Sequence, residues 1–72
     1  KEAQYSLGMV YLIGSGVPKD YVQAYKWFDI SRQMGFLDGL WQRNEIEKRM
    51  TADQISKAER LAEEWIDEHE KN

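Results

Sequence analysis

Apolar and small residues recur at helical spacing in the first part of the chain. They are Ala3, Leu7, Val10, Tyr11 and Gly14. Intervals of three and four residues are typical of an amphipathic helix, so we predict a helix over residues 2–13. The segment that follows, Gly14-Ser15-Gly16-Val17-Pro18, contains the two residue types that most often interrupt helices, and it predicts a tight turn. A helix and not a strand precedes this turn, which argues against a phosphate-binding glycine loop.

A second helix is predicted from residue 20 to about residue 34. Asp20 can accept hydrogen bonds from free backbone N–H groups of the first turn, and Gln23 is placed to reach back as in a capping box. The apolar face of this helix consists of Tyr21, Ala24, Trp27, Phe28 and Ser31. Gly35 follows where a left-handed C-terminal cap needs a residue without Cβ. The first two helices should pair as a hairpin, with Tyr11, Trp27 and Phe28 in the core.

Two further helices complete the predicted structure. The third spans about residues 38–49, where Gly39 is an unfavourable helix former. Its apolar residues are Leu40, Trp41 and Ile46. Thr51 and Gln54 form a second capping-box pattern, which opens a fourth helix that should end near residue 68. The apolar stripe of that helix is Ile55, Ala58, Leu61, Ala62 and Trp65.

The second and fourth predicted helices resemble each other. An offset of 34 residues aligns Tyr21 with Ile55, Ala24 with Ala58, Trp27 with Leu61 and Ser31 with Trp65. Helix hairpins repeated with a period in the mid-thirties are typical of a solenoid, in which each hairpin buries its apolar face on its neighbours. We therefore predict an all-α fold of about four helices, in which antiparallel hairpins stack as an α/α superhelix. Residues 1–36 would form one complete repeat, and residues 37–72 a degenerate second repeat with a C-terminal capping helix.

The first predicted hairpin also carries the pattern of a known family. Its residues are Ala3-Gln4-Tyr5-x-Leu7-Gly8-x-x-Tyr11-x-x-Gly14-x-Gly16-Val17-x-x-Asp20-x-x-x-Ala24-x-x-Trp27, closing with Gly35. This pattern resembles the Sel-one-like repeat, a relative of the tetratricopeptide repeat, over residues 2–37. The following stretch departs from it, because Arg43 and Asn44 stand where Leu7 and Gly8 would recur.

The resemblance implies a scaffold that binds a protein or peptide, since members of this family serve mainly as adaptors in protein complexes. In tetratricopeptide repeats the first helix of each hairpin lines the concave surface. By that analogy, the implied partner-binding residues are Tyr5, Met9, Leu12, Trp41 and Glu45. A cysteine-rich branch of the family has been linked to β-lactamase or penicillin-binding activity. A cell-wall or β-lactam hydrolase is therefore a remote alternative, disfavoured because this chain has no cysteine.

Charge and composition argue against several other functions. The net charge is −3, and residues 45–72 carry nine acidic against five basic residues, so the chain lacks the Lys/Arg stripe of nucleic-acid-binding proteins. The apolar run of residues 9–13 is far shorter than the roughly 20 residues that cross a bilayer. His69 has no convergent metal ligands, and Glu64 and Glu68 share a polar solvent face that lacks the enclosed site a catalytic carboxylate pair needs. We expect no catalytic residue, no metal and no cofactor.

Two further hypotheses stand beside the scaffold. The chain could serve only as the structural end of a longer array whose binding residues lie upstream, because the outer face of the fourth helix is strongly polar. In addition, a single good repeat leaves an apolar edge open, and a twofold homodimer through that edge would cover it. The residues expected at this edge are Tyr5, Val10, Leu12 and Ile13.

Overall fold

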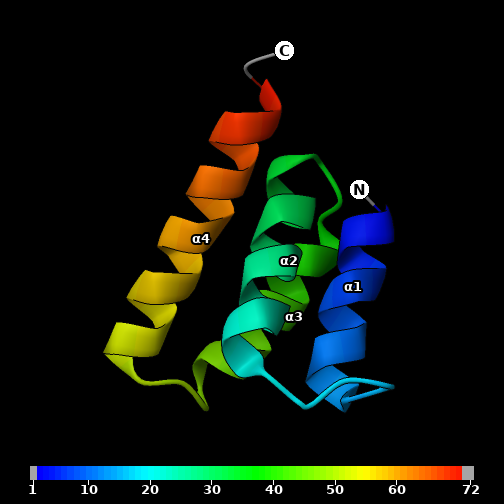
Figure 1. Cartoon of the computed structure of the whole chain (residues 1–72), viewed down its shortest axis with the longest axis vertical. Helices are drawn as coiled ribbons and strands as arrows, with labels where there is room; N and C mark the ends of the chain where they lie inside the picture. Colours follow the sequence, from blue (N-terminus) through cyan, green and yellow to red (C-terminus); the bar gives the residue numbers. More distant parts are fainter. Residues whose placement is uncertain (1, 71–72) are drawn as a thin grey trace.

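Four helices make up the part of the chain that the structure describes, residues 2–70. In this computed structural model α1 spans Glu2–Ile13, α2 spans Tyr21–Gln33, α3 spans Asp38–Glu47 and α4 spans Ala52–Glu70 (Figure 1). Every predicted helix is present, and no strand occurs among the described residues. α3 ends two residues earlier than predicted and α4 continues two residues further. The predicted all-α fold is confirmed.

Helix α2 lies at the centre of the molecule, and the other three helices pack against it (Figure 1). The core is accordingly built around α2. Its buried apolar cluster is Ala24, Tyr25 and Phe28, joined by Ile46 of α3 and Ala58 of α4. α3 and α4 each contact α2, and they contact each other far less. The molecule is therefore held together mainly through the residues that α2 presents to its three neighbours.

The three aromatic residues predicted to fill the core differ in burial. Phe28 is fully buried, whereas Trp27 and Tyr11 are only half-buried. Trp27 lies at the margin of the α2–α4 contact, where its ring meets that of Trp65 edge-on with centroids 5.5 Å apart. Tyr11 packs against the core from α1. Trp27 and Tyr11 are thus boundary residues, because their large rings extend past the narrow strip along which the helices meet.

The C-terminus of α2 closes with the glycine cap expected at Gly35. Gly35 has a φ of 96°, a conformation that residues with a Cβ rarely adopt. Its N–H donates to the Arg32 carbonyl at 2.9 Å, and the Phe36 N–H donates to the Ser31 carbonyl at 3.0 Å. These two bonds define a Schellman motif, which satisfies carbonyl groups at the helix end and turns the chain toward α3.

The N-terminus of α2 is capped by Asp20, as predicted. The Asp20 carboxylate accepts from the backbone N–H groups of Val22 at 3.0 Å and Gln23 at 3.2 Å. The expected return bond from the Gln23 side chain is replaced, because the Asp20 N–H donates to the Tyr11 carbonyl at 3.0 Å. That backbone bond joins the end of α1 to the start of α2, so the cap also secures the hairpin.

α4 opens with the predicted capping box. The Gln54 N–H donates to the Thr51 hydroxyl oxygen at 3.1 Å, and the Thr51 N–H donates to the Gln54 side-chain oxygen at 2.9 Å. Two N–H groups that the helix itself cannot satisfy therefore have partners. The start of α4 is fixed locally, within four residues of sequence.

The packing face of α1 differs from the predicted one. The face that meets the core consists of Tyr5, Gly8, Met9 and Leu12, of which Gly8 is fully buried and the others are half-buried. Leu7, which was expected to face inward, is 40% exposed. The physical reason lies at Gly8, where a Cβ would come within 2.6 Å of the Phe28 ring. Only a glycine lets the helix approach this ring, and that approach turns Leu7 away from α2.

Helices α2 and α3 are held together by a close backbone approach and a buried ion network. A Cβ at Gly39 would overlap the Phe28 carbonyl oxygen and would lie 3.1 Å from the Arg32 backbone nitrogen. Nearby, the Asp29 carboxylate is only 4% exposed. It pairs with Arg32 at 2.9 Å and with Arg43 of α3 at 2.7 Å. The glycine that weakened the helix prediction is therefore the residue that allows α3 to dock.

Candidate functional site

The three residues predicted to bind a partner from α1 contribute substantially to packing. Tyr5, Met9 and Leu12 are half-buried and lie against the core cluster. The Tyr5 ring has its centroid 5.4 Å from that of Phe28 and 5.2 Å from that of Phe36. Each of these side chains therefore has one side in the protein interior and one side at the surface.

Tyr5 also connects α1 to α3. The Gln42 side-chain nitrogen donates to the Tyr5 hydroxyl oxygen, with 3.4 Å between the two atoms. This long hydrogen bond joins residues 37 positions apart in sequence and places the surface sides of α1 and α3 next to each other. Tyr5 of the predicted set therefore lies beside α3.

The two predicted residues of α3 are well exposed. Trp41 is 70% exposed, and Leu37, one helical turn before it, is 63% exposed. Glu45 lies one turn after Trp41 and forms an ion pair with Lys48, with 2.9 Å between the Lys48 Nζ and a Glu45 carboxylate oxygen. The hydrogen bond from Lys48 lowers the pKa of the Glu45 carboxyl. One face of α3 therefore presents two large apolar groups followed by a charged pair.

A groove of about 270 Å³ lies beside this face. Its lining comes from Leu12 of α1, from Gln42, Glu45 and Ile46 of α3, and from Lys19, Tyr21 and Arg49 at one end. The structure thus brings Leu12 and Glu45 to one groove. Tyr5, Met9 and Trp41 lie outside its lining.

The basic end of the groove was not predicted from the sequence. The Lys19 Nζ lies 5.5 Å from the centre of the Tyr21 ring. A hydrogen bond with Arg49 lowers the pKa of the Tyr21 hydroxyl, and the charge of Lys19 acts in the same direction. Lys19 and Arg49 are 30 positions apart, and no local motif relates them. The exposed Leu37 was not predicted either. Its interval of four residues from Trp41 could have shown that the two side chains lie on one helix face.

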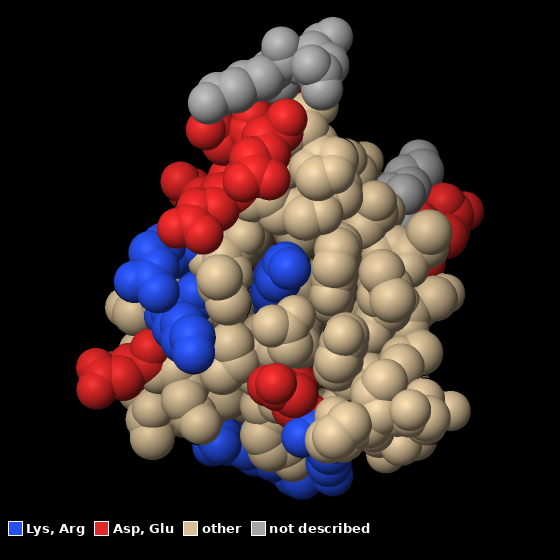
Figure 2. Space-filling model, in the orientation of Figure 1, with Lys and Arg blue, Asp and Glu red and all other residues tan. Residues whose placement is uncertain are grey.

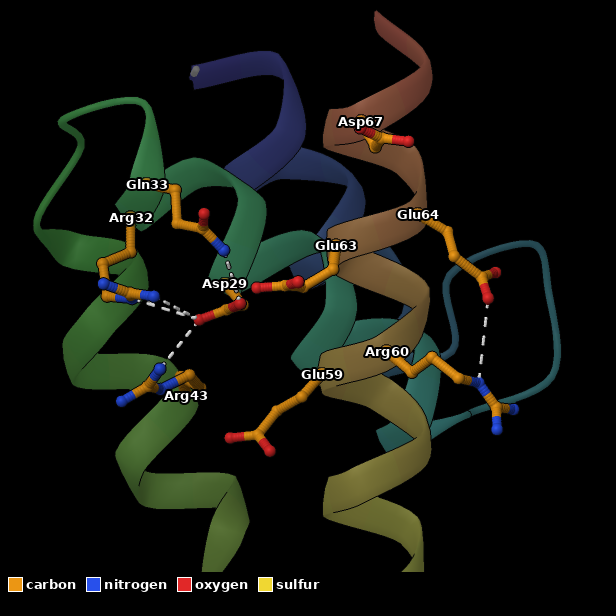
Figure 3. A pocket seen from close by; sticks show the side chains of 9 residues that line it. All are labelled: Asp29, Arg32, Gln33, Arg43, Glu59, Arg60, Glu63, Glu64 and Asp67. Atoms are coloured by element: carbon orange, nitrogen blue, oxygen red, sulfur yellow. Dashed lines mark hydrogen bonds and ion pairs between the residues drawn. The ribbon is translucent and has the colours of Figure 1, made fainter. Parts of the chain in front are cut away.

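A larger cleft of about 810 Å³ lies at the surface between α4 on one side and α2 and α3 on the other. Every residue that lines it is polar or charged, and Glu59 and Glu63 point from α4 toward the wall that holds Asp29 (Figure 3). Glu59 also accepts a hydrogen bond from the buried Tyr25 hydroxyl at 3.2 Å. This cleft has no apolar side chain in its lining. Arg32 and Arg43 are both ion-paired with Asp29, so they do not form a free pair of cations.

Acidic side chains gather over the C-terminal part of α4 (Figure 2). They are Glu63, Glu64, Asp67, Glu68 and Glu70, all exposed. His69, also exposed, stacks on the Trp65 ring with centroids 3.8 Å apart. Within residues 2–70 no group of three or more His, Cys, Asp or Glu side chains is placed to hold a metal ion. Among the described helices, none has both the length and the apolar character that crossing a bilayer requires.

Comparison with known proteins identifies the first hairpin. A family model for the Sel1 repeat matches residues 1–36, which is half of the chain. No curated protein and no solved structure matches the chain. The matched segment contains α1, the glycine turn, α2 and the Gly35 cap.

Proposed function

We propose that this chain, which belongs to the Sel1 repeat family, binds a partner protein or peptide along the adjoining surfaces of α1 and α3. The family forms helical, tetratricopeptide-like solenoids that typically act as non-catalytic scaffolds for protein interaction. The partner-binding residues of this proposal are Tyr5, Met9, Leu12, Trp41 and Glu45, with Leu37 added on its exposure. Under this proposal the chain has no catalytic activity of its own.

The observation that carries the proposal is the exposure of Trp41. A tryptophan that is 70% exposed leaves a large apolar surface in water, and tryptophan is the residue type most often dominant in protein interfaces. Leu37 extends the same patch by one turn, and the Glu45–Lys48 pair borders it. An apolar centre beside a charged border is the usual composition of a binding surface.

The residues of α1 have a second role in this proposal. Tyr5, Met9 and Leu12 hold α1 on the core, while Tyr5 also contacts Gln42 of α3 and Leu12 lines the groove beside Glu45. Substituting them would remove packing as well as surface. The exposed residues Leu37, Trp41 and Glu45 therefore separate binding from stability better than the residues of α1 do.

Substitution of Trp41 tests the proposal. The Trp41→Ala variant should lose proteins that the wild type retains in affinity capture from an extract of its source cells. Its thermal midpoint should stay within about 2 °C, because an exposed side chain contributes little to folding. Met34→Ala is the matched control, since Met34 is an apolar side chain that is 45% exposed at the end of α2 and is not one of the proposed partner-binding residues. Equal capture by the wild type and Trp41→Ala would contradict the assignment of this surface.

A second candidate function is that of a structural cap, and α4 favours it. In this proposal residues 1–36 form a complete repeat, and residues 37–72 form a degenerate repeat with a capping helix. α4 buries Ala58 and Ala62 against the rest of the protein and turns an acidic face outward. Removing residues 51–72 should expose Tyr25, which is fully buried, and cause aggregation. A truncated chain that stays soluble and cooperatively folded would contradict the capping role.

A further inference from the structure

Two basic side chains converge on Tyr21 at one end of the groove between α1 and α3. Lys19 approaches the face of the Tyr21 ring, with its Nζ 5.5 Å from the ring centre. Arg49 lines the same end of the groove beside Tyr21. Lys19 comes from the turn before α2 and Arg49 from the turn after α3, so two separate connections meet at this point.

Neither Lys19 nor Arg49 forms a short ion pair among the described residues. Within residues 2–70, four ion pairs occur, and none includes Lys19 or Arg49. The nearby Asp20 carboxylate caps α2, and the Glu45 carboxylate is paired with Lys48. In a chain of net charge −3, a groove lined by two cations and one carboxylate is an exception to the general excess of acid. The groove lining therefore keeps a net positive charge, because Glu45 interacts with Arg49 but is also paired with Lys48.

We propose that Lys19, Tyr21 and Arg49 form a subsite for a carboxylate side chain, Glu or Asp, of an extended partner segment. This inference rests on the proposed function, because it assigns one contact of the partner that binds α1 and α3. The groove lining contains two cations, Lys19 and Arg49, and one carboxylate, that of Glu45. Its net charge is therefore +1, which matches a single negative charge. Leu12 and Ile46 form its apolar sides and hold the aliphatic part of that side chain.

The position of the subsite along α3 predicts a spacing in the partner. Arg49 lies eight residues after Trp41 and two residues beyond the end of α3, and Lys48 between them keeps a helical conformation, so the helical rise of 1.5 Å per residue gives a separation of roughly 12 Å. An extended chain advances about 3.3 Å per residue, so about four residues span this distance. The partner segment should therefore carry an apolar residue and an acidic residue about four positions apart, the first against Leu37 and Trp41 and the second against Arg49.

Two model peptides test the inference directly. They are acetylated, amidated pentapeptides, Leu-Ser-Ser-Ser-Glu and Leu-Ser-Ser-Ser-Lys, titrated into the 72-residue protein at low ionic strength and followed by NMR. The acidic peptide should shift the amides of Lys19, Tyr21 and Arg49 and bind about fivefold tighter than the basic one, as expected for two exposed charge pairs. This preference should fall to about twofold or less in 0.5 M salt, where exposed charges are screened.

Substitutions at the subsite separate this contact from the rest of the surface. The double variant Lys19→Gln, Arg49→Gln should bind the two peptides equally. Lys57→Gln removes an exposed lysine of α4 outside the groove and should leave the preference intact. Retention of the preference in the double variant would overturn the inference.

The remaining outcomes distinguish this inference from the proposed function. If both peptides bind equally to the wild type and both are lost in Trp41→Ala, the binding surface stands and the carboxylate subsite is wrong. If neither peptide binds at millimolar concentration, the subsite and the proposed patch on α3 are both wrong. Binding of the acidic peptide that is unaffected by Trp41→Ala supports the subsite and rejects the predicted spacing.

Discussion

Replacing Gly39 with alanine should destabilise the protein, although alanine is the better helix former. In an exposed helix interior this change stabilises by about 1 kcal/mol. Gly39, however, is buried against α2, where a Cβ would overlap the Phe28 carbonyl oxygen and crowd the Ser31 Cβ at 3.2 Å. A backbone carbonyl within a helix cannot rotate away, so α3 itself must shift.

The expected size of the effect follows from these two opposing contributions. Overpacking a well-packed contact costs about 1–3 kcal/mol, and overlap with rigid backbone belongs at the upper end of that range. Subtracting the propensity gain leaves a net destabilisation of about 1–2 kcal/mol. For a protein of 72 residues this lowers the thermal midpoint by about 10 °C. The sign of the change is the decisive observation, because propensity and packing predict opposite signs.

Thermal unfolding followed by far-ultraviolet circular dichroism measures this change. Asn44→Ala is the matched control, since Asn44 is an exposed residue of α3 whose replacement gains helix propensity and removes one long, exposed hydrogen bond from Arg43, at 3.4 Å. That variant should melt at the wild-type temperature or a few degrees above it. If Gly39→Ala were to raise the midpoint as Asn44→Ala does, the close approach of α3 to α2 would be refuted.

Two further predictions concern alkaline stability and self-association. Burial raises the pKa of the Tyr25 hydroxyl, so this group stabilises the fold below its unfolded pKa of about 10 and the contribution is lost as pH rises further. Between pH 10 and about 11.5 the urea midpoint of the wild type should therefore fall more steeply than that of Tyr25→Phe, and equal slopes would contradict the burial of this hydroxyl. We also propose that the exposed apolar side chains of α1, with Ile13 65% exposed and Leu7 40% exposed, support a twofold homodimer. Sedimentation equilibrium should show a dimer that Ile13→Asp dissociates, and a wild-type monomer with a melting temperature independent of concentration would exclude it.

Helix positions and caps could be predicted because they depend on neighbours in sequence. The capping box of Thr51 and Gln54 closes within four residues, and Asp20 needs only the next three residues to act as a cap. The left-handed conformation of Gly35 is likewise a local requirement. Such interactions are complete before any helix meets another, so residue type and spacing suffice to identify them.

The packing face of α1 could not be predicted in the same way. α1 is apolar on several sides, so periodicity alone allowed either Leu7 or Tyr5 to face inward. The face that packs inward is determined by the close approach of Gly8 to the Phe28 ring, and these two residues belong to different helices. The basic end of the groove escaped prediction for a similar reason, because Lys19 and Arg49 meet only after α1, α2 and α3 have packed.

The orientation of α3 shows how a helix with little apolar character can still present a defined surface. Three residues on one side attach it to α2: Gly39 permits close backbone approach, Arg43 pairs with the buried Asp29, and Ile46 enters the core. Their intervals of four and three place them on a single face. These contacts on the opposite face keep Trp41 in solvent. The apolar character of its side chain alone would favour burial. The residues that determine the fold of α3 therefore also determine which side chain is left in water for a partner.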